Sequence, residues 1–479
     1  MISKSRSPGR QSKPSLADPA SFRDPSTRVF HNGGRILRTL RGQAADDWSR
    51  LASSELLRRL IDRGALIPTR EVRTGELAAG DRPVAEGDAW SLLLEHERVP
   101  FVSYPYEWSF SMLQDAAALH LEVLLEALSE GMTLKDGSAF NVQWMGTAPV
   151  FIDVGSFEPT KGAPWAGYRQ FCQTFLYPLF LQSYSGVPYQ PFLRGQVEGF
   201  TPAQMRRLIA ARLWFRAGVF KHVVLHDALQ RRFPNDAQAT VSRLRDAGFN
   251  DQLTARMAKS LLRLVRRLGS RRRPSHWLDY ARTCTYTDAE RAAKAEVVRR
   301  GLVGPAGRVV LDLGCNDGTY SRMAAEAGAF VIAVDSDEEV VDNLYKAVRR
   351  EGRGRILPLV VDVADPSPGI GWRGRERLGF FERTSPDVVL CLALIHHLVI
   401  GRNIPLVQVV DWLRSLDARV VVEFVDRDDH MAKRLLANKP AGIHDDYRIE
   451  LFERELGRCF RIRERAPLHT RTLFTADPK

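Results

Sequence analysis

The sequence of 479 residues predicts an α/β protein with a doubly wound parallel sheet at its C-terminus, preceded by an α+β domain and a helical connector. Two observations carry this prediction. Short apolar runs alternate with helical segments from residue 308 onward, which is typical of strand–helix–strand units. Four successive runs then end in polar side chains, where a ligand crevice forms in such sheets; these are Asp335, Asp362, the pair His396 and His397, and Asp426.

The first of these units begins with RVVLDLGCNDGTYS, residues 308–321. Its apolar run predicts a buried strand that enters a turn, and residues 319–327 predict a helix that Gly328 ends. Gly314 and Gly318 allow positive φ or a close approach to a ligand, and Asn316 tolerates the left-handed region. Strand, glycine-bearing loop and helix together are typical of nucleotide sites.

Further strands are predicted at residues 329–335, 356–362, 386–398 and 418–426. Asp335 lies 21 residues after Gly314 and 17 after Gly318. An acidic residue at about this separation accepts hydrogen bonds from two ribose hydroxyls. The spacing GCNDG departs from the G-x-G-x-x-G pattern, so an NAD-dependent enzyme is disfavoured.

The ordered motifs DLGCNDG, VIAVDSD, VVD and LIHHL resemble those of class I S-adenosylmethionine-dependent methyltransferases. VEFVDRDDHMAKRLL, DDYRIELFERELGRCF and TRTLF are similar to a bacterial subgroup that includes rhizobial nodulation proteins. The resemblance covers about residues 276–479 and is fainter upstream. It implies a Rossmann-like domain over residues 275–479, S-adenosyl-L-methionine as cofactor, and methyl transfer to a small molecule or glycan.

The resemblance also implies three sets of cofactor contacts. The amino-acid end and sugar would meet the glycine loop, the ribose hydroxyls the end of the second strand, and adenine the end of the third. In that order, the residues are Asp312, Gly314, Asn316, Asp317 and Gly318; Asp335 and Ser336; and Asp362 and Val363. In related enzymes, tyrosines of the lead-in segment can cover the cofactor, which makes Tyr280 and Tyr286 candidates.

His396 and His397 are the catalytic candidates, because they stand beside the position of methyl transfer. One could take a proton from a hydroxyl or amine acceptor, since histidine titrates near neutral pH. The alternative is that the pair shapes the pocket or binds substrate. Glu423, Asp426 and His430 follow the fifth strand and are weaker candidates.

Residues 1–26 are polar and predict a disordered tail without the apolar core of a secretory signal. Residues 27–195 predict the α+β domain, with helices at 44–64 and 109–131 and strand-like runs at 90–93 and 101–106. A turn at Gly146 joins two short strands, around residues 141–144 and 149–154. The aromatic-rich segment 164–193 is interpreted as core rather than as an acceptor pocket.

One segment of this domain resembles the catalytic and metal-binding loops of protein kinases. Asp136 precedes Asn141 by five residues, and Asp153-Val154-Gly155 follows. The resemblance implies that Asp136 orients a hydroxyl and that Asn141 and Asp153 hold Mg²⁺. The sequence departs from the kinase pattern in that the strand lysine is missing and HNGGR is a poor glycine loop. The alternative is a hairpin in which Asp and Asn serve the turns.

Residues 196–274 predict a basic helical connector. The net charge of +12 allows an acidic partner, but a solvated face is the default and we expect no nucleic-acid function. Five scattered cysteines predict reduced thiols in a cytoplasmic protein and no metal site. No apolar run reaches the ~18–20 residues of a membrane span. Two alternatives to the methyltransferase stay open. One is a non-catalytic binding or assembly protein that keeps the cofactor fold, and the other is a two-domain protein with a kinase-like N-terminal module.

Overall fold

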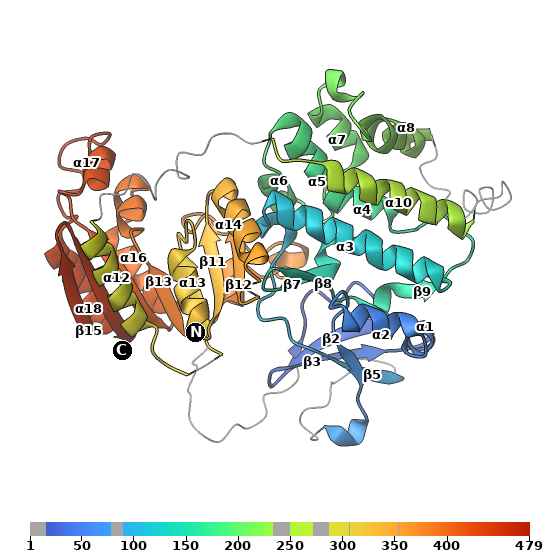
Figure 1. The fold of residues 1–479 in the computed structure, drawn as a ribbon, viewed down its shortest axis with the longest axis horizontal. Helices are drawn as coiled ribbons and strands as arrows, with labels where there is room; N and C mark the ends of the chain where they lie inside the picture. Colours follow the sequence, from blue (N-terminus) through green and yellow to red (C-terminus); the bar gives the residue numbers. More distant parts are fainter. Residues whose placement is uncertain (1–15, 78–89, 233–249, 272–286, 306, 353) are drawn as a thin grey trace.

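The computed structural model describes residues 16–77, 90–232, 250–271, 287–305, 307–352 and 354–479. Two parts lie side by side in Figure 1, the N-terminal half in blue to green and the C-terminal part in yellow to red. The candidate tyrosines Tyr280 and Tyr286, and Cys284, lie outside the described residues.

The C-terminal part is built on a seven-stranded sheet. Apolar strands rich in Val, Ile and Leu are buried on both faces, as expected for a parallel sheet. The order across the sheet is β12 (Ile356–Val360), β11 (Phe330–Asp335), β10 (Val309–Leu313), β13 (Val388–Cys391), β14 (Arg419–Val425), β16 (Arg471–Pro478) and β15 (Phe460–Leu468).

The first five strands are parallel, and β16 and β15 add an antiparallel edge. The chain runs outward from β10 in both directions, so its direction switches between β10 and β13. This arrangement confirms the prediction of a doubly wound sheet, and the switch point is where ligands bind in such sheets.

Helices cover the faces of this sheet (Figure 1). α14 shows how the sequence specifies one of them: Val341, Leu344 and Val348 form its buried face, and the Asp337 side chain accepts from two backbone N–H groups at its start. The helices are α12 (Asp288–Gly301), α13 (Thr319–Glu326), α14 (Glu338–Arg350), α15 (Phe380–Arg383), α16 (Leu406–Ser415), α17 (His430–Leu436) and α18 (Ile449–Cys459).

The predicted strand at 386–398 is wrong in its second half. β13 ends at Cys391, and Ala393 has a φ of 50°, which a strand does not accommodate. A helical turn, His397–Gly401, follows. The two histidines therefore lie on a turn beyond the strand, and the apolar residues around them are buried loop and helix.

The N-terminal half begins with a five-stranded antiparallel sheet and two short helices, followed by the long helix α3 (Phe110–Ser129). The strand order is β1 (Leu16–Ala17), β2 (Thr27–Asn32), β3 (Arg35–Leu40), β5 (Leu92–His96) and β4 (Thr69–Glu71), and the two helices are α1 (Gln43–Ala52) and α2 (Glu55–Asp62).

Three local predictions differ from this arrangement. The single helix expected at 44–64 is two helices, and residues 101–106 form no strand, since Pro105 starts a 3-10 turn there. Residues 16–26, assigned to a tail, carry strand β1, which pairs with β2. Arg23 in this segment also ion-pairs with Glu376 of the C-terminal part at 2.7 Å.

Two small antiparallel sheets follow α3. The first pairs β6 (Met132–Leu134) with β9 (Phe157–Pro159), and the second is the hairpin of β7 (Val142–Met145) and β8 (Ala148–Phe151). The second confirms the strands predicted around Gly146. A helical layer lies above them in Figure 1: α4 (Tyr168–Phe171), α5 (Tyr177–Phe180), α6 (Gln190–Gly195), α7 (Pro202–Leu208), η9 (Phe220–Val224), α8 (Leu225–Arg232) and α10 (Asp251–Arg267).

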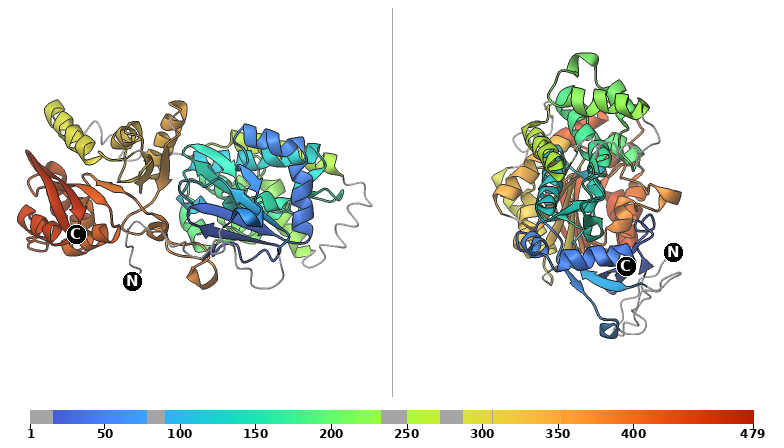
Figure 2. Two further views of the ribbon diagram at one scale, coloured as in Figure 1. Left: turned by 90° about the horizontal axis from the view of Figure 1, so that it is seen from below. Right: turned by 90° about the vertical axis from the view of Figure 1, so that its right-hand side faces the viewer.

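One buried apolar cluster includes residues of both halves, which the left-hand view of Figure 2 shows as two parts side by side. Trp144 of β7 meets Tyr345 of α14 edge to face, with ring centroids 5.6 Å apart. Glu107 is ion-paired with Arg383 and accepts from Ser367 Oγ at 2.5 Å, all three side chains being buried. The halves are therefore packed together through buried apolar and polar contacts.

Candidate functional site

A cavity of about 330 Å³ opens at the carboxyl ends of the central parallel strands. It lies at the switch point between β10 and β13, where the doubly wound sheet leaves a crevice. Its volume is in the range of small-molecule and cofactor sites. The cavity is lined by Gly314, Asn316, Asp335, Ser336, Val361, Asp362, Val363, Ala364, Leu392, Ala393, Leu394, His397, Leu398, Gly401 and Arg402.

The glycine loop after β10 forms one wall. Gly314, Asn316 and Gly318 have positive φ values of 71°, 47° and 76°. A Cβ at Gly318 would lie 2.4 Å from the Leu344 side chain of α14, so a larger residue would have to displace that side chain in addition to adopting a positive φ. Cys315 is buried, and burial raises the pKa of its thiol well above the ordinary value, as for a packing residue.

Asp335 is the last residue of β11 and lines the cavity. Its carboxylate accepts from the Asn316 N–H at 3.2 Å and from the Asp337 N–H at 3.0 Å. Burial nevertheless raises the pKa of Asp335. The two N–H groups fix the carboxylate where it faces the cavity, and such a fixed acceptor can take two hydroxyl hydrogen bonds.

Three of the predicted cofactor residues lie outside the cavity lining, namely Gly318, the N-cap of α13, and the two acids Asp312 and Asp317. Asp312 is buried below the cavity and accepts from Ser321 Oγ at 2.6 Å. Burial raises the pKa of Asp312 to about 6. Asp317 accepts from the N–H and the hydroxyl of Thr319, at 3.0 and 2.8 Å, at the start of α13. Both carboxylates hold the loop rather than face the cavity.

Asp362 and Val363 line the opposite end of the cavity, after β12. Asp362 accepts from the Ala364 N–H at 2.9 Å and from Arg402 Nη2 at 2.6 Å. Arg402 was missed by the sequence analysis. No motif marks it, and only the turn after β13 brings it to Asp362 from 40 residues away.

The two histidines have different surroundings. His397 lines the cavity, and burial together with the nearby Arg471 lowers its pKa to about 4. His396 is fully buried behind it, with ring centroids 4.0 Å apart, and burial lowers its pKa well below the ordinary value. His397 is therefore neutral near pH 7 and reaches the cavity, whereas His396 packs against its ring.

A buried layer of ion pairs lies behind this end of the sheet. Glu423 of β14 pairs with Lys294 of α12 at 2.7 Å and with Arg471 of β16 at 3.6 Å. Arg471 also pairs with Asp429 at 3.0 Å. Glu423, one of the weaker catalytic candidates, is thus fully buried, and its ion pairs link β14 to α12 and β16. Its two basic partners supply the positive charge near the histidines.

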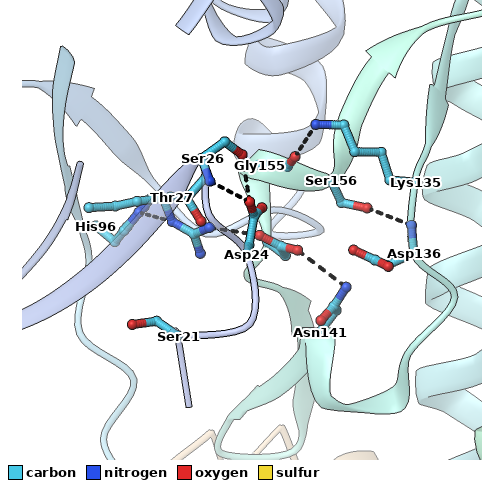
Figure 3. A network of polar contacts seen from close by, with 12 residues as sticks. Ser21, Asp24, Ser26, Thr27, His96, Lys135, Asp136, Asn141, Gly155 and Ser156 are labelled. Atoms are coloured by element: carbon cyan, nitrogen blue, oxygen red, sulfur yellow. Dashed lines mark hydrogen bonds and ion pairs between the residues drawn. The ribbon is translucent and has the colours of Figure 1, made fainter. Parts of the chain in front are cut away.

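The kinase-like residues form a second polar cluster, shown in Figure 3. Asp136 and Asn141, from the segment between β6 and β7, lie near Asp153, and Asn141 Nδ2 donates to Asp153 Oδ2 at 3.4 Å. Arg38 of β3 reaches Asp153 Oδ1 with Nη1 at 2.8 Å. Arg38 could not be predicted from the sequence, because a basic residue in a strand carries no local signal of its distant partner.

The charges of this cluster shift the pKa of Asp136. Partial desolvation and the negative charges of Asp153 and Asp24 raise the pKa of Asp136 to about 6. Arg38 also donates from Nε to His96 Nε2 at 3.2 Å. The charge of the Asp153 carboxylate is balanced by the guanidinium of Arg38, which β3 contributes. Among the residues that the structure describes, no group of three or more His, Cys, Asp or Glu side chains could hold a metal ion.

Comparison with known proteins adds one relative over nearly the full length. Nodulation protein NoeA of Rhizobium meliloti (strain 1021) is 34% identical over 466 residues, which is 95% of each chain. No protein-family model matches the sequence.

Solved structures resemble the chain more remotely. A SAM-dependent methyltransferase from Aquifex aeolicus is 18% identical and covers 38% of this chain and 88% of its own, with a TM-score of 0.26. Magnesium protoporphyrin IX methyltransferase from Synechocystis PCC 6803 is 17% identical over 43% and 86%, with a TM-score of 0.28. The bifunctional kinase-methyltransferase WbdD is 16% identical over 42% and 41%, with a TM-score of 0.30. None of these distant likenesses is evidence for an activity.

The doubly wound sheet, the glycine loop and the acidic strand ends around one crevice define a class I methyltransferase domain. S-adenosyl-L-methionine is the cofactor of this class. The chain belongs to the family of the nodulation protein NoeA.

Proposed function

We propose that this protein is an S-adenosylmethionine-dependent methyltransferase that acts on a small molecule or glycan. The observation that carries the proposal is the position of Asp335, whose carboxylate is fixed by two backbone N–H groups and faces a cavity that His397 also lines. A fixed acceptor for ribose hydroxyls and a neutral base thus share one crevice.

The residues present fit the cofactor. Asp335 would accept from the ribose hydroxyls, while the backbone of Gly314 and Asn316 allows the sugar and amino-acid end to approach closely. Asp362 and Val363 would meet adenine. Arg402, whose side chain is exposed, would share or release Asp362. Bound there, the cofactor supplies an already activated methyl group, so the protein mainly has to position the acceptor.

His397 is our candidate for the proton transfer. Its lowered pKa keeps the ring neutral near pH 7, and it lines the same cavity as Asp335. A neutral imidazole can accept a proton from an acceptor hydroxyl or amine as that atom is methylated. His396 and the ion pairs of Lys294, Glu423 and Arg471 would hold this ring in place and neutral.

The test is the affinity for S-adenosylhomocysteine, measured by calorimetry for the wild type, Asp335→Ala and Asp317→Ala. Removing the ribose acceptor should weaken binding about tenfold to hundredfold. Asp317→Ala should have a much smaller effect, because its carboxylate serves Thr319 and does not line the cavity.

Binding that follows this order would justify a screen of acceptors with a labelled methyl donor. Absence of binding by correctly folded wild type would contradict the proposal. A binding or assembly protein that keeps the fold would then be the better description. Tight binding of S-adenosylhomocysteine without turnover on any acceptor would favour the same alternative.

A further inference from the structure

An unusual surface lies on the helical layer of the N-terminal half, far from the sheet of the methyltransferase domain. Among the described residues, 13 large hydrophobic side chains are exposed, and five of them fall within residues 208–229. Phe215 is 92% exposed and Phe220 56%. We call this surface the Phe215 patch; its apolar members are Leu208, Phe215, Phe220, Leu225 and Leu229.

The local sequence turns apolar side chains outward here. In the continuous helical segment formed by η9 and α8, His222, Val223 and Asp227 face the protein. Phe220, Leu225 and Leu229 are on the exposed side. Surface helices of globular proteins normally show the reverse pattern, with polar residues outward. Exposed apolar groups gathered in this way mark an interaction surface.

The same segment is strongly basic. Its exposed cations include Arg207, Arg212, Arg216 and Lys221. Between residues 199 and 232 the only acidic residue is Asp227, which is buried and ion-paired with Arg206 and Arg231. Within this segment no acidic side chain therefore offsets the exposed positive charge.

The patch is also held firmly and projects outward. α7 packs against η9 and α8, and Arg206 lies over the Trp214 ring at 5.3 Å, which anchors the loop that carries Phe215. In Figure 1 the α7–α8 region forms the upper edge of the molecule, and the right-hand view of Figure 2 places it there as well. It can therefore meet a large flat surface without hindrance from the sheets.

We propose that the Phe215 patch docks the protein on an anionic lipid bilayer. Aromatic and leucine side chains beside Lys and Arg are the combination that inserts into the boundary between head groups and acyl chains. The cations would pair with anionic head groups, and the apolar side chains would enter the hydrocarbon boundary. A second copy docked on the same patch would bring like charges together, which disfavours self-association there.

This docking is peripheral. Within the described ranges, no helix is both long and apolar enough to cross a membrane. The inference does not depend on methyl transfer, since none of the patch residues lines the cofactor cavity.

The experiment is co-sedimentation of the full-length protein with vesicles. One set is phosphatidylcholine with about one third phosphatidylglycerol, and the other is phosphatidylcholine alone. Wild type should bind the anionic vesicles and lose this binding at high salt, because salt screens the attraction. Phe215→Ser should weaken binding about tenfold or more. Arg212→Glu combined with Arg216→Glu should abolish the preference for anionic lipid.

Matched controls are Trp372→Ser and Ile443→Ser, which remove exposed apolar side chains elsewhere. Both should bind vesicles as the wild type does. Because all these side chains are exposed, each variant should keep the thermal stability and the S-adenosylhomocysteine affinity of the wild type.

Three outcomes would overturn the proposal. The first is failure of the wild type to bind anionic vesicles, and the second is binding that Phe215→Ser and Trp372→Ser weaken equally. The third is a lipid-free dimer that Phe215→Ser dissociates, since this would make a second copy the occupant of the patch.

Discussion

Ser109 Oγ donates to Asp342 Oδ1 at 2.8 Å and thereby joins the start of α3 in the N-terminal half to the middle of α14 in the methyltransferase domain. The same carboxylate accepts from the Ser111 N–H at 2.9 Å, and Glu338 accepts from the Phe110 N–H at 2.8 Å. Free N–H groups at the start of a helix need acceptors. Here the partner domain supplies them, so the two halves complete each other.

We predict that Asp342→Ala lowers the free energy of unfolding by about 2–4 kcal/mol, because it leaves the buried Ser109 hydroxyl and Ser111 N–H without their acceptor. Denaturant unfolding measures the effect. Arg350→Ala, an exposed change on the same helix, should alter stability by less than about 0.5 kcal/mol. Equal effects of the two substitutions would show that the contact contributes little.

His397→Gln should reduce methyl transfer by about 10²–10⁴-fold if the ring takes the proton of the acceptor. S-adenosylhomocysteine affinity should change little in comparison. Since the pKa of His397 is lowered to about 4, the ring stays unprotonated above that value. The low-pH loss of kcat/KM, which reports groups of the free enzyme, should therefore centre near 4 rather than near the ordinary histidine pKa of about 6.5.

His430→Gln is the matched control, because this exposed histidine begins α17 and does not line the cavity. It should retain activity. Full activity of His397→Gln would instead support the alternative in which the histidine pair only shapes the pocket.

His120 should make the protein sensitive to acid. It is fully buried among Phe151, Trp165, Phe171 and Phe175, and burial lowers its pKa to about 3. In the unfolded chain its pKa is about 6.5, so the unfolded state binds more protons between these two values. The stability of the fold is then complete above about pH 6.5 and decreases as the pH falls toward 3.

His120→Leu removes this contribution. The free energy of unfolding of the wild type should fall more steeply between pH 6 and 4 than that of the variant, by up to about 1.4 kcal/mol per pH unit. Denaturant unfolding at several pH values measures both slopes. Parallel curves would mean that His120 is not held neutral by the fold.

The Arg38–Asp153 pair should stabilise the N-terminal half. Both side chains are mostly buried, so Arg38→Met should cost about 1–3 kcal/mol by leaving a carboxylate without its partner. Arg38→Met combined with Asp153→Asn should cost less than the sum of the single changes. Arg50→Met, an exposed change on α1, is the control.

The same variants address the kinase-like hypothesis, which stays a prediction. Titration with ATP and Mg²⁺ should show binding that Asp153→Asn abolishes if this cluster is a nucleotide site. No binding by the wild type would leave the Arg38–Asp153 pair as a structural link between the sheet and the hairpin.

The sequence by itself determined the strand–loop–helix units of the methyltransferase domain. The strands containing Leu311, Ile332 and Leu357 are continuous apolar runs buried on both faces, and this signal is local. Gly314, Gly318 and Asp335 were identified in the same way, because a turn with positive φ and an acidic strand end are encoded within a few neighbouring residues.

Only the tertiary structure decided what the remaining side chains do. It turned Asp312 and Asp317 toward Ser321 and Thr319, and it brought Arg402 to Asp362. Lys294 meets Glu423 from 129 residues away, and Ser109 meets Asp342 from 233. Such partners depend on how whole elements pack, and a polar residue in a sequence carries no signal of a partner that folding alone brings near.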